Sequence, residues 1–145
     1  MTTTPAAAAP ARAAAGSRPF RYGRLAITAV IAAVANTLVF AVGSAAGASM
    51  SIDSPAYSQI TLVMSAVATL LPLLVAGGAT WLVARRFPGF RRIAQWLGLA
   101  VALLSMISPF VVAQDSATAV SLAAMHLVAG AAWFFGLAST GRRAR

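Results

Sequence analysis

The chain has 145 residues, of which 60% are hydrophobic and 9% are charged, and its mean hydropathy is +0.84. A soluble domain carries about 25% charged residues because it must cover its core with a hydrated surface, so this composition excludes an ordinary soluble protein and favours a membrane protein. The chain has no cysteine, which excludes disulfide bonds, thiolate metal sites and a thiol nucleophile. The net charge of +9 would suggest a nucleic-acid partner in a soluble protein, but the positions of the basic residues argue against nucleic acid here.

All eleven basic residues are arginines, and they fall in three blocks at residues 12–24, 85–92 and 142–145. Each block adjoins an apolar stretch, as is typical of charges that orient membrane helices. The apolar segments are residues 25–50, 57–84, 93–114 and 118–140. Each is longer than the roughly 20 residues that cross about 30 Å of hydrocarbon at about 1.5 Å per residue. The sequence therefore predicts an all-α membrane protein, a bundle of four transmembrane helices.

Charge also predicts the orientation of the bundle. Asp53 and Asp115 occupy the two connections that lack arginine. Because arginine is enriched in cytoplasmic loops, we expect a multi-pass protein of the plasma membrane with both termini and the loop at residues 85–92 in the cytoplasm. Residues 1–24, rich in Ala, Pro, Thr and Ser, predict a disordered cytoplasmic tail, and residues 141–145 predict a short basic one. Residues 46–48 resemble a signal-peptidase site, but the apolar run before them exceeds the length of a signal sequence, so we expect an uncleaved first span.

A few polar residues fall at mid-depth in the predicted helices. Helical rise places Asn36 about 18 Å from the cytoplasmic start of the first helix and His126 about 12 Å from the outer start of the fourth, at nearly the same depth. Ser65, Thr69 and Ser105 fall in the same layer, so we expect these five side chains to form a candidate polar layer. In a structural interpretation, their hydrogen bonds fix helix register at about 0.6 kcal/mol each. In a functional interpretation, His126 titrates or binds a ligand in a polar cavity.

Small residues and prolines predict how the helices pack and bend. Gly43 and Gly47 form a GxxxG step on the inward face of the first helix, and Gly130 lies on the inward face of the fourth. We expect all three glycines to let helices approach closely. Pro72 and Pro109 each remove a backbone hydrogen bond, so we expect the second and third helices to bend there.

Chemically reactive side chains are scarce. His126 is the single histidine, and without Cys or Glu it cannot assemble the three or four protein ligands of a zinc or iron site. We therefore expect no metal and no other cofactor. Asp115, the acid nearest to His126 in sequence, is about 16 Å away along the helix, which argues against serine hydrolysis and against an enzyme. Asp115 and Asp53 better suit the outer ends of helices, as caps.

The connection between the second and third spans reads RRFPGFRR, with a Pro-Gly turn at its centre. Its four arginines are Arg85, Arg86, Arg91 and Arg92. In one interpretation these arginines bind anionic lipid headgroups at about 1 kcal/mol each; in the other they only anchor the topology. The two halves of the chain also share an Asp-Ser pair and an Arg pair in the same order. This pattern fits a weak tandem repeat of two helix hairpins, or a chance similarity between two apolar hairpins.

The span region contains an Asp-Ser turn before the fourth helix and the segment AMHLV at residues 124–128. With these features it resembles the small four-span membrane proteins of unknown function that are common in high-GC Gram-positive bacteria. The resemblance covers about residues 20–140. It implies a plasma-membrane protein and supplies no activity.

Three functional hypotheses follow from the sequence, of which an enzyme is the least favoured. The favoured one is a non-enzymatic integral membrane protein that acts through helix contacts, as an accessory or assembly factor or as a homo-oligomer. Its expected partners are anionic membrane lipids, a second copy of the chain or another membrane protein. The alternative is a small transporter, channel or binder of a lipophilic ligand that uses the polar layer around Asn36 and His126. A water-filled path would favour the alternative, and a dry, fully packed bundle would favour the first hypothesis.

Overall fold

Long helices make up most of the described part of the chain. The computed structural model describes residues 21–138. Its helices in chain order are α1 (Tyr22–Ala45), α2 (Leu62–Arg86), α3 (Phe90–Ser105), α4 (Ser108–Val112) and α5 (Ser116–Leu137). Because α3 and α4 follow one another along the same span, Phe90–Val112, four spans in this part of the chain are long and apolar enough to cross a membrane. The predicted helical class with four membrane-length spans is confirmed. The predicted tails lie outside the described residues, apart from residues 21–24, of which Tyr22–Arg24 form the first turn of α1.

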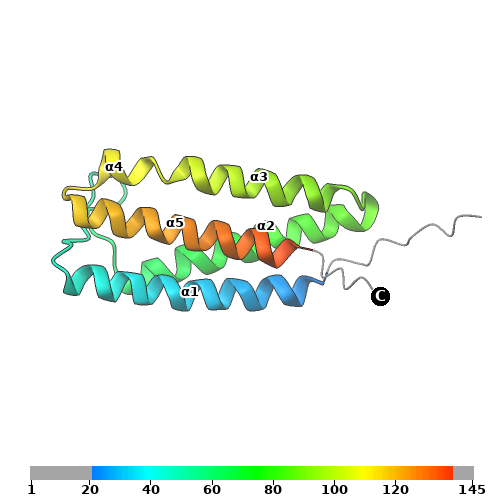
Figure 1. The fold of residues 1–145 in the computed structure, drawn as a ribbon, viewed down its shortest axis with the longest axis horizontal. Helices are drawn as coiled ribbons and strands as arrows, with labels where there is room; N and C mark the ends of the chain where they lie inside the picture. Colours follow the sequence, from blue (N-terminus) through cyan, green and yellow to red (C-terminus); the bar gives the residue numbers. More distant parts are fainter. Residues whose placement is uncertain (1–20, 139–145) are drawn as a thin grey trace, which may run out of the picture.

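The four spans lie side by side, and successive spans run in opposite directions (Figure 1). α1 packs along both α2 and α5, and α5 packs along both α1 and α3, whereas α2 and α3 touch much less. The start of α1, the α2–α3 turn and the end of α5 lie at one end. This arginine end holds Arg21, Arg24, Arg85, Arg86, Arg91 and Arg92. The α1–α2 and α4–α5 connections form the opposite, aspartate end, which holds Asp53 and Asp115.

The connection between α1 and α2 is longer than the predicted spans at residues 25–50 and 57–84 allow. The Ala48 N–H donates to the Gly43 carbonyl (2.9 Å), and Gly47 between them has a φ of 94°, so α1 ends in a glycine C-cap of the Schellman type. Two antiparallel bridges then pair the extended chain with itself and with the α4–α5 connection: Ser51 with Gln59, and Ile52 with Ala113. The backbone groups of this connection therefore form hydrogen bonds in the C-cap and the two bridges, and not in a longer α1 or α2.

The two prolines have different effects. α2 continues through Pro72 as one helix. Pro109 lies in the first turn of α4, and the chain between Ser105 and Ser108 forms a turn. A proline is tolerated in the first turn of a helix, where its missing N–H would have no partner in any case. The sequence predicts a bend at each proline. The third span is instead interrupted just before Pro109, and the bend of α2 at Pro72 stays a prediction.

Glycines make room for the largest core side chains. Leu25 is fully buried, and a Cβ on Gly77 of α2 or on Gly136 of α5 would collide with the Leu25 side chain. Trp133 of α5 lies against Gly98 of α3 in the same way, and its Nε1 donates to the Ala94 carbonyl (2.9 Å). Small residues at helix crossings allow the close approach that stabilises helix packing within a membrane.

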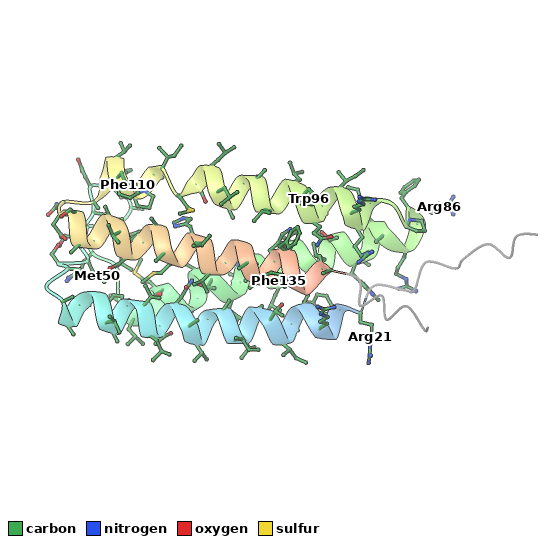
Figure 2. All side chains as sticks on the ribbon, viewed as in Figure 1. Arg21, Met50, Arg86, Trp96, Phe110 and Phe135 are labelled. Carbon is green, nitrogen blue, oxygen red and sulfur yellow. The ribbon has the colours of Figure 1, made fainter. Side chains whose placement is uncertain are left out.

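Large apolar side chains cover the outside of the bundle. Figure 2 shows them along the length of the helices, with Arg21 and Arg86 at one end and Met50 at the other. Trp96, Phe110 and Phe135 are each more than half exposed. An exposed apolar surface of this extent is expected where the solvent is lipid rather than water.

Candidate functional site

A buried polar cluster joins three helices near mid-depth. Asn36 on α1 is 1% exposed, and its Nδ2 donates to Thr69 Oγ1 on α2 (2.7 Å) and to the Met125 carbonyl on α5 (3.1 Å). Thr69 Oγ1 donates to the Ser65 carbonyl (2.8 Å), and Ser65 Oγ donates to the Asn36 carbonyl (3.3 Å). Asn36, Ser65 and Thr69 therefore form one hydrogen-bonded cluster.

One buried acceptor of this cluster has no hydrogen-bond partner in the described part of the chain. This acceptor is Asn36 Oδ1. A buried acceptor without a partner costs about 1–3 kcal/mol, whereas a hydrogen bond between membrane helices contributes about 0.6 kcal/mol. The cluster thus sets the register of α1, α2 and α5 while adding little net stability.

The other two residues of the expected polar layer bond elsewhere. Ser105 Oγ donates to a carbonyl one turn earlier in its own helix (2.8 Å). His126 Nδ1 lies 2.7 Å from the Leu122 carbonyl oxygen. Because a carbonyl oxygen can only accept, the ring nitrogen is the donor in this hydrogen bond. His126 shares its face of α5 with Gly130 and Trp133, which pack on α3 rather than on α1. The structure therefore brings three of the five residues together and leaves Ser105 and His126 outside the cluster.

Two of the three expected packing glycines lie at helix contacts. A Cβ on Gly43 would meet Ser121 of α5, and a Cβ on Gly130 would meet Ala102 of α3. The expectation for Gly47 is wrong, because α1 ends before it and a Cβ there would have nothing within 4 Å. Gly47 instead provides the positive φ that the C-cap of α1 requires.

A groove of about 600 Å³ lies between α1 and α5 in the half of the bundle near the aspartate end. Small side chains, including Gly43 and Ala117, alternate in its lining with exposed branched ones such as Val42 and Val120. The complete lining is Leu38, Val39, Val42, Gly43, Ala46, Ser116, Ala117, Val120, Ser121 and Ala124. Gly43 and Ser121 lie at the buried floor of the groove, where α1 and α5 pack together, whereas Val42 and Val120 are exposed at its edges. The groove therefore opens sideways from the bundle.

Asp115 organises the aspartate end. Its Oδ1 accepts from the Thr118 N–H (2.7 Å), which confirms the predicted cap of the last helix, and its Oδ2 accepts from the hydroxyls of Ser49 (2.6 Å) and Thr118 (2.7 Å). These bonds, the Ser49 hydroxyl first, hold the pKa of the Asp115 carboxyl well below its ordinary value. The expected cap at Asp53 is wrong: Asp53 is exposed, and Thr61 caps α2 instead. The two Asp-Ser pairs thus have different roles, which removes one element of the expected repeat.

Three polar side chains from neighbouring helices cap the carboxyl end of α5. Arg24 donates to the Ala138 carbonyl (2.8 Å), Arg91 to the Leu137 carbonyl (2.6 Å) and Gln95 to the Phe134 carbonyl (2.9 Å). The last carbonyls of a helix have no partner within the helix, and positive charge is favourable at this end of its dipole. Arg24 and Arg91 therefore bind the protein itself.

The other arginines of the α2–α3 turn lie on the surface. The Arg85 guanidinium stands over the Trp81 ring, 4.8 Å from its centroid, in a cation–π contact. Arg86 and Arg92 are exposed on the two sides of the turn. The four arginines of this connection are thus in three different environments.

Within residues 21–138, no group of three or more His, Cys, Asp and Glu side chains could hold a metal ion. The sites that this part of the chain offers are the Asn36 cluster, the lateral groove and the two charged ends. The Asn36 cluster consists of hydrogen bonds, the groove is lined by packing side chains without charge, and fixed charges lie only at the two ends.

Comparison with known proteins places the chain in a family. No curated protein and no solved structure matches it. Residues 16–143, which include all four membrane-length spans, match the family described as "Family of unknown function (DUF6069)". The chain therefore belongs to DUF6069.

Proposed function

We propose that this protein is a non-enzymatic, multi-pass protein of the plasma membrane that acts through lateral helix contacts as a homo-oligomer. In this proposal both termini and the arginine end face the cytoplasm, in accordance with the bias of arginine toward cytoplasmic connections. The observation that carries the proposal is the lateral groove between α1 and α5. It is an apolar hollow of about 600 Å³ on the lipid-facing side of the bundle.

The shape of this surface suits a second copy of the chain. Leu38, Val42 and Val120 are 60% or more exposed and stand beside the part of the groove that is lined by the smaller side chains of Ala46 and Ala117. A surface with a ridge next to a hollow can pair with itself, because a two-fold axis places the ridge of each copy in the hollow of the other. Because both copies have the same orientation in the membrane, this axis must lie along the membrane normal. The residues that meet across it then lie at the same depth in both copies. Small residues at such a contact allow the close packing that drives association in lipid.

The alternative, a transporter or ligand binder, depends on a polar layer shared by Asn36 and His126. In the structure Asn36 bonds to α2 and α5, whereas His126 donates to its own helix on the face that packs on α3. The geometric basis of a shared layer is therefore weaker than that of the lateral contact.

The proposal is tested by cross-linking in membranes, since a chain without cysteine accepts single reporter cysteines. Val42→Cys places a thiol at the edge of the groove, and Val67→Cys places the matched control on the exposed side of α2. With a short bis-maleimide linker, we expect Val42→Cys to give a product of twice the chain mass and Val67→Cys to stay monomeric. Equal yields from both variants, a monomeric Val42→Cys, or a Val42→Cys product formed only with a different protein would overturn the proposal.

A further inference from the structure

The arginine end carries positive charge with no acidic side chain beside it among residues 21–138. The sequence contains only two acidic side chains, Asp53 and Asp115, and both lie at the opposite end of the bundle. Six of the eleven arginines belong to the arginine end of the described structure. No acidic side chain of this sequence therefore lies at the arginine end to pair with their charge.

The structure separates these arginines by what they already bind. Arg24 and Arg91 donate to the carboxyl end of α5, and Arg85 stands over Trp81. Arg86 and Arg92 are exposed, and the structure gives them no side-chain hydrogen bond within residues 21–138. Across the α2–α3 turn they are only six positions apart, so two free guanidinium groups flank one tight turn.

Arg92 is in addition unfavourably placed for its own helix. It occupies the first turn of α3, where the helix dipole is positive, and this turn contains no acidic residue. A cation at this end of a helix is destabilising by the same effect that makes a carboxylate stabilising there. Arg92 therefore does not stabilise α3 by itself. An anion bound from outside would offset its unfavourable charge at this end of the helix.

Apolar and aromatic side chains continue from the turn into the membrane-facing surface. Phe87 in the turn is 63% exposed, and Trp96 is 56% exposed one helical turn after Arg92, on the same face of α3. Figure 2 shows Arg86 at the tip of the turn and Trp96 further along α3. Tryptophan is typical of the level of the lipid headgroups. The arginines of the turn would therefore lie at the level of a phospholipid's headgroup, and the exposed apolar residues of α3 would lie at the level of its acyl chain.

We propose that the α2–α3 turn is a binding site for an anionic phospholipid. Arg86 and Arg92 hold its phosphate, Arg85 contributes further positive charge from its place over Trp81, and an acyl chain lies along the exposed face of α3 at Trp96. Guanidinium groups suit this ligand because they bind phosphate oxygens through two parallel hydrogen bonds. Arg91, in the same sequence motif, is not part of the site because it caps α5. The site requires neither the oligomer nor the orientation proposed above.

The test compares lipid binding by the full chain in nanodiscs that contain phosphatidylglycerol in a phosphatidylcholine background, read by native mass spectrometry. Arg92→Gln removes one charge from the site, and Arg21→Gln removes one charge from the start of α1, which Figure 2 shows well away from Arg86. Near an anionic membrane surface one arginine contributes about a fivefold factor in binding. We expect Arg92→Gln to lower the preference for phosphatidylglycerol about fivefold, the double variant Arg86→Gln/Arg92→Gln to lower it about 30-fold, and Arg21→Gln to change it less than about twofold.

Two further arms distinguish a lipid site from a diffuse surface charge and from a site for free phosphate. Arg92→Lys keeps the charge but loses the paired hydrogen bonds, so its affinity for phosphatidylglycerol should lie between those of the original chain and Arg92→Gln. No variant should melt at a lower temperature than the original chain in pure phosphatidylcholine. Soluble inorganic phosphate at millimolar concentration should not displace the lipid. Equal losses for Arg21→Gln and Arg92→Gln would show a general surface charge and overturn the site. Displacement by free phosphate, or no preference for phosphatidylglycerol in the original chain, would overturn its assignment to a lipid.

Discussion

Arg91 and Arg92 are adjacent, carry the same charge and lie in the same turn of α3, yet the structure predicts opposite consequences of replacing them. Arg91 Nη1 donates to the Leu137 carbonyl (2.6 Å), and Arg91 is half-buried. A hydrogen bond to a charged group contributes about 1.5–3 kcal/mol. Because Arg91 keeps some contact with solvent, we take the lower end, and we expect Arg91→Gln to reduce the free energy of unfolding by about 1.5 kcal/mol.

Arg92 has no such bond and lies at the positive end of the α3 dipole. Arg92→Gln should therefore leave the free energy of unfolding unchanged, or raise it by about 0.3–1 kcal/mol, the size of a charge–dipole interaction at a helix end. The assay is unfolding of each full-length variant by titration with a denaturing detergent in zwitterionic micelles, followed by helical circular dichroism. Zwitterionic micelles are required so that a lipid bound at Arg92 does not contribute to stability.

The lipid measurement should separate the two variants. Arg91→Gln should lower the free energy of unfolding and keep the preference for phosphatidylglycerol. Arg92→Gln should keep the free energy of unfolding and lower the preference for phosphatidylglycerol. Equal destabilisation by both variants would refute the assignment of Arg91 to the cap of α5. A larger effect of Arg92→Gln on unfolding would refute it as well.

Three further outcomes are expected. Gly98→Ala should destabilise the bundle by about 1–3 kcal/mol, because its Cβ would overlap the Trp133 indole, whereas Gly23→Ala, which meets nothing, should not destabilise it in the same unfolding assay. Gly47→Ala should cost about 1 kcal/mol through its positive φ and leave cross-linking from Val42→Cys unchanged; a loss of cross-linking would restore Gly47 to a helix contact. Since the pKa of Asp115 is lowered in the folded protein, its stabilising effect is complete above the ordinary carboxyl pKa of about 3.9 and is lost as the pH falls below that value. Melting curves at pH 3 and pH 6 should therefore differ less for Asp115→Asn than for the original chain, and an equal difference would contradict this role of Asp115.

The depth of a residue in the membrane could be predicted from sequence, but the direction in which it faces could not. Helical rise predicts similar depths for Asn36 and His126, and Asn36 indeed bonds to Met125, the residue before His126. Neighbouring positions on a helix point about 100° apart, however, so Met125 faces α1 while His126 lies on the side that packs on α3. Rotation about the helix axis depends on which helices are neighbours, and four apolar segments alone do not specify their arrangement.

Helix ends were harder to predict than helices for a similar reason. Gly47 extends the small-residue face of α1 by one turn on a helical wheel, yet the same glycine is suited to end the helix by its positive φ. The loop that follows pairs with the α4–α5 connection about 60 positions later, a contact that local sequence does not reveal.

The roles of Arg24, Arg91 and Gln95 depend on the end of α5 lying between α1 and α3. Arginines beside apolar segments indicate orientation whatever else they do, so the sequence gives no sign that two of them bind carbonyls of the last helix. Trp133 and Gly98 offer a weak signal in retrospect, because a large side chain in one predicted span needs a small residue in another. The sequence contains eleven glycines, and only the structure selects the one that Trp133 meets.

The central claim is that this chain crosses the membrane four times, with the arginine end in the cytoplasm and the aspartate end outside. Single cysteines introduced at Gly89 in the α2–α3 turn and at Ser54 in the α1–α2 connection, both in the cysteine-free chain, test it directly. A membrane-impermeant maleimide should label Ser54→Cys in intact cells and should label Gly89→Cys only after the membrane is permeabilised. Labelling of Gly89→Cys from outside, or of both cysteines from the same side, would contradict the account.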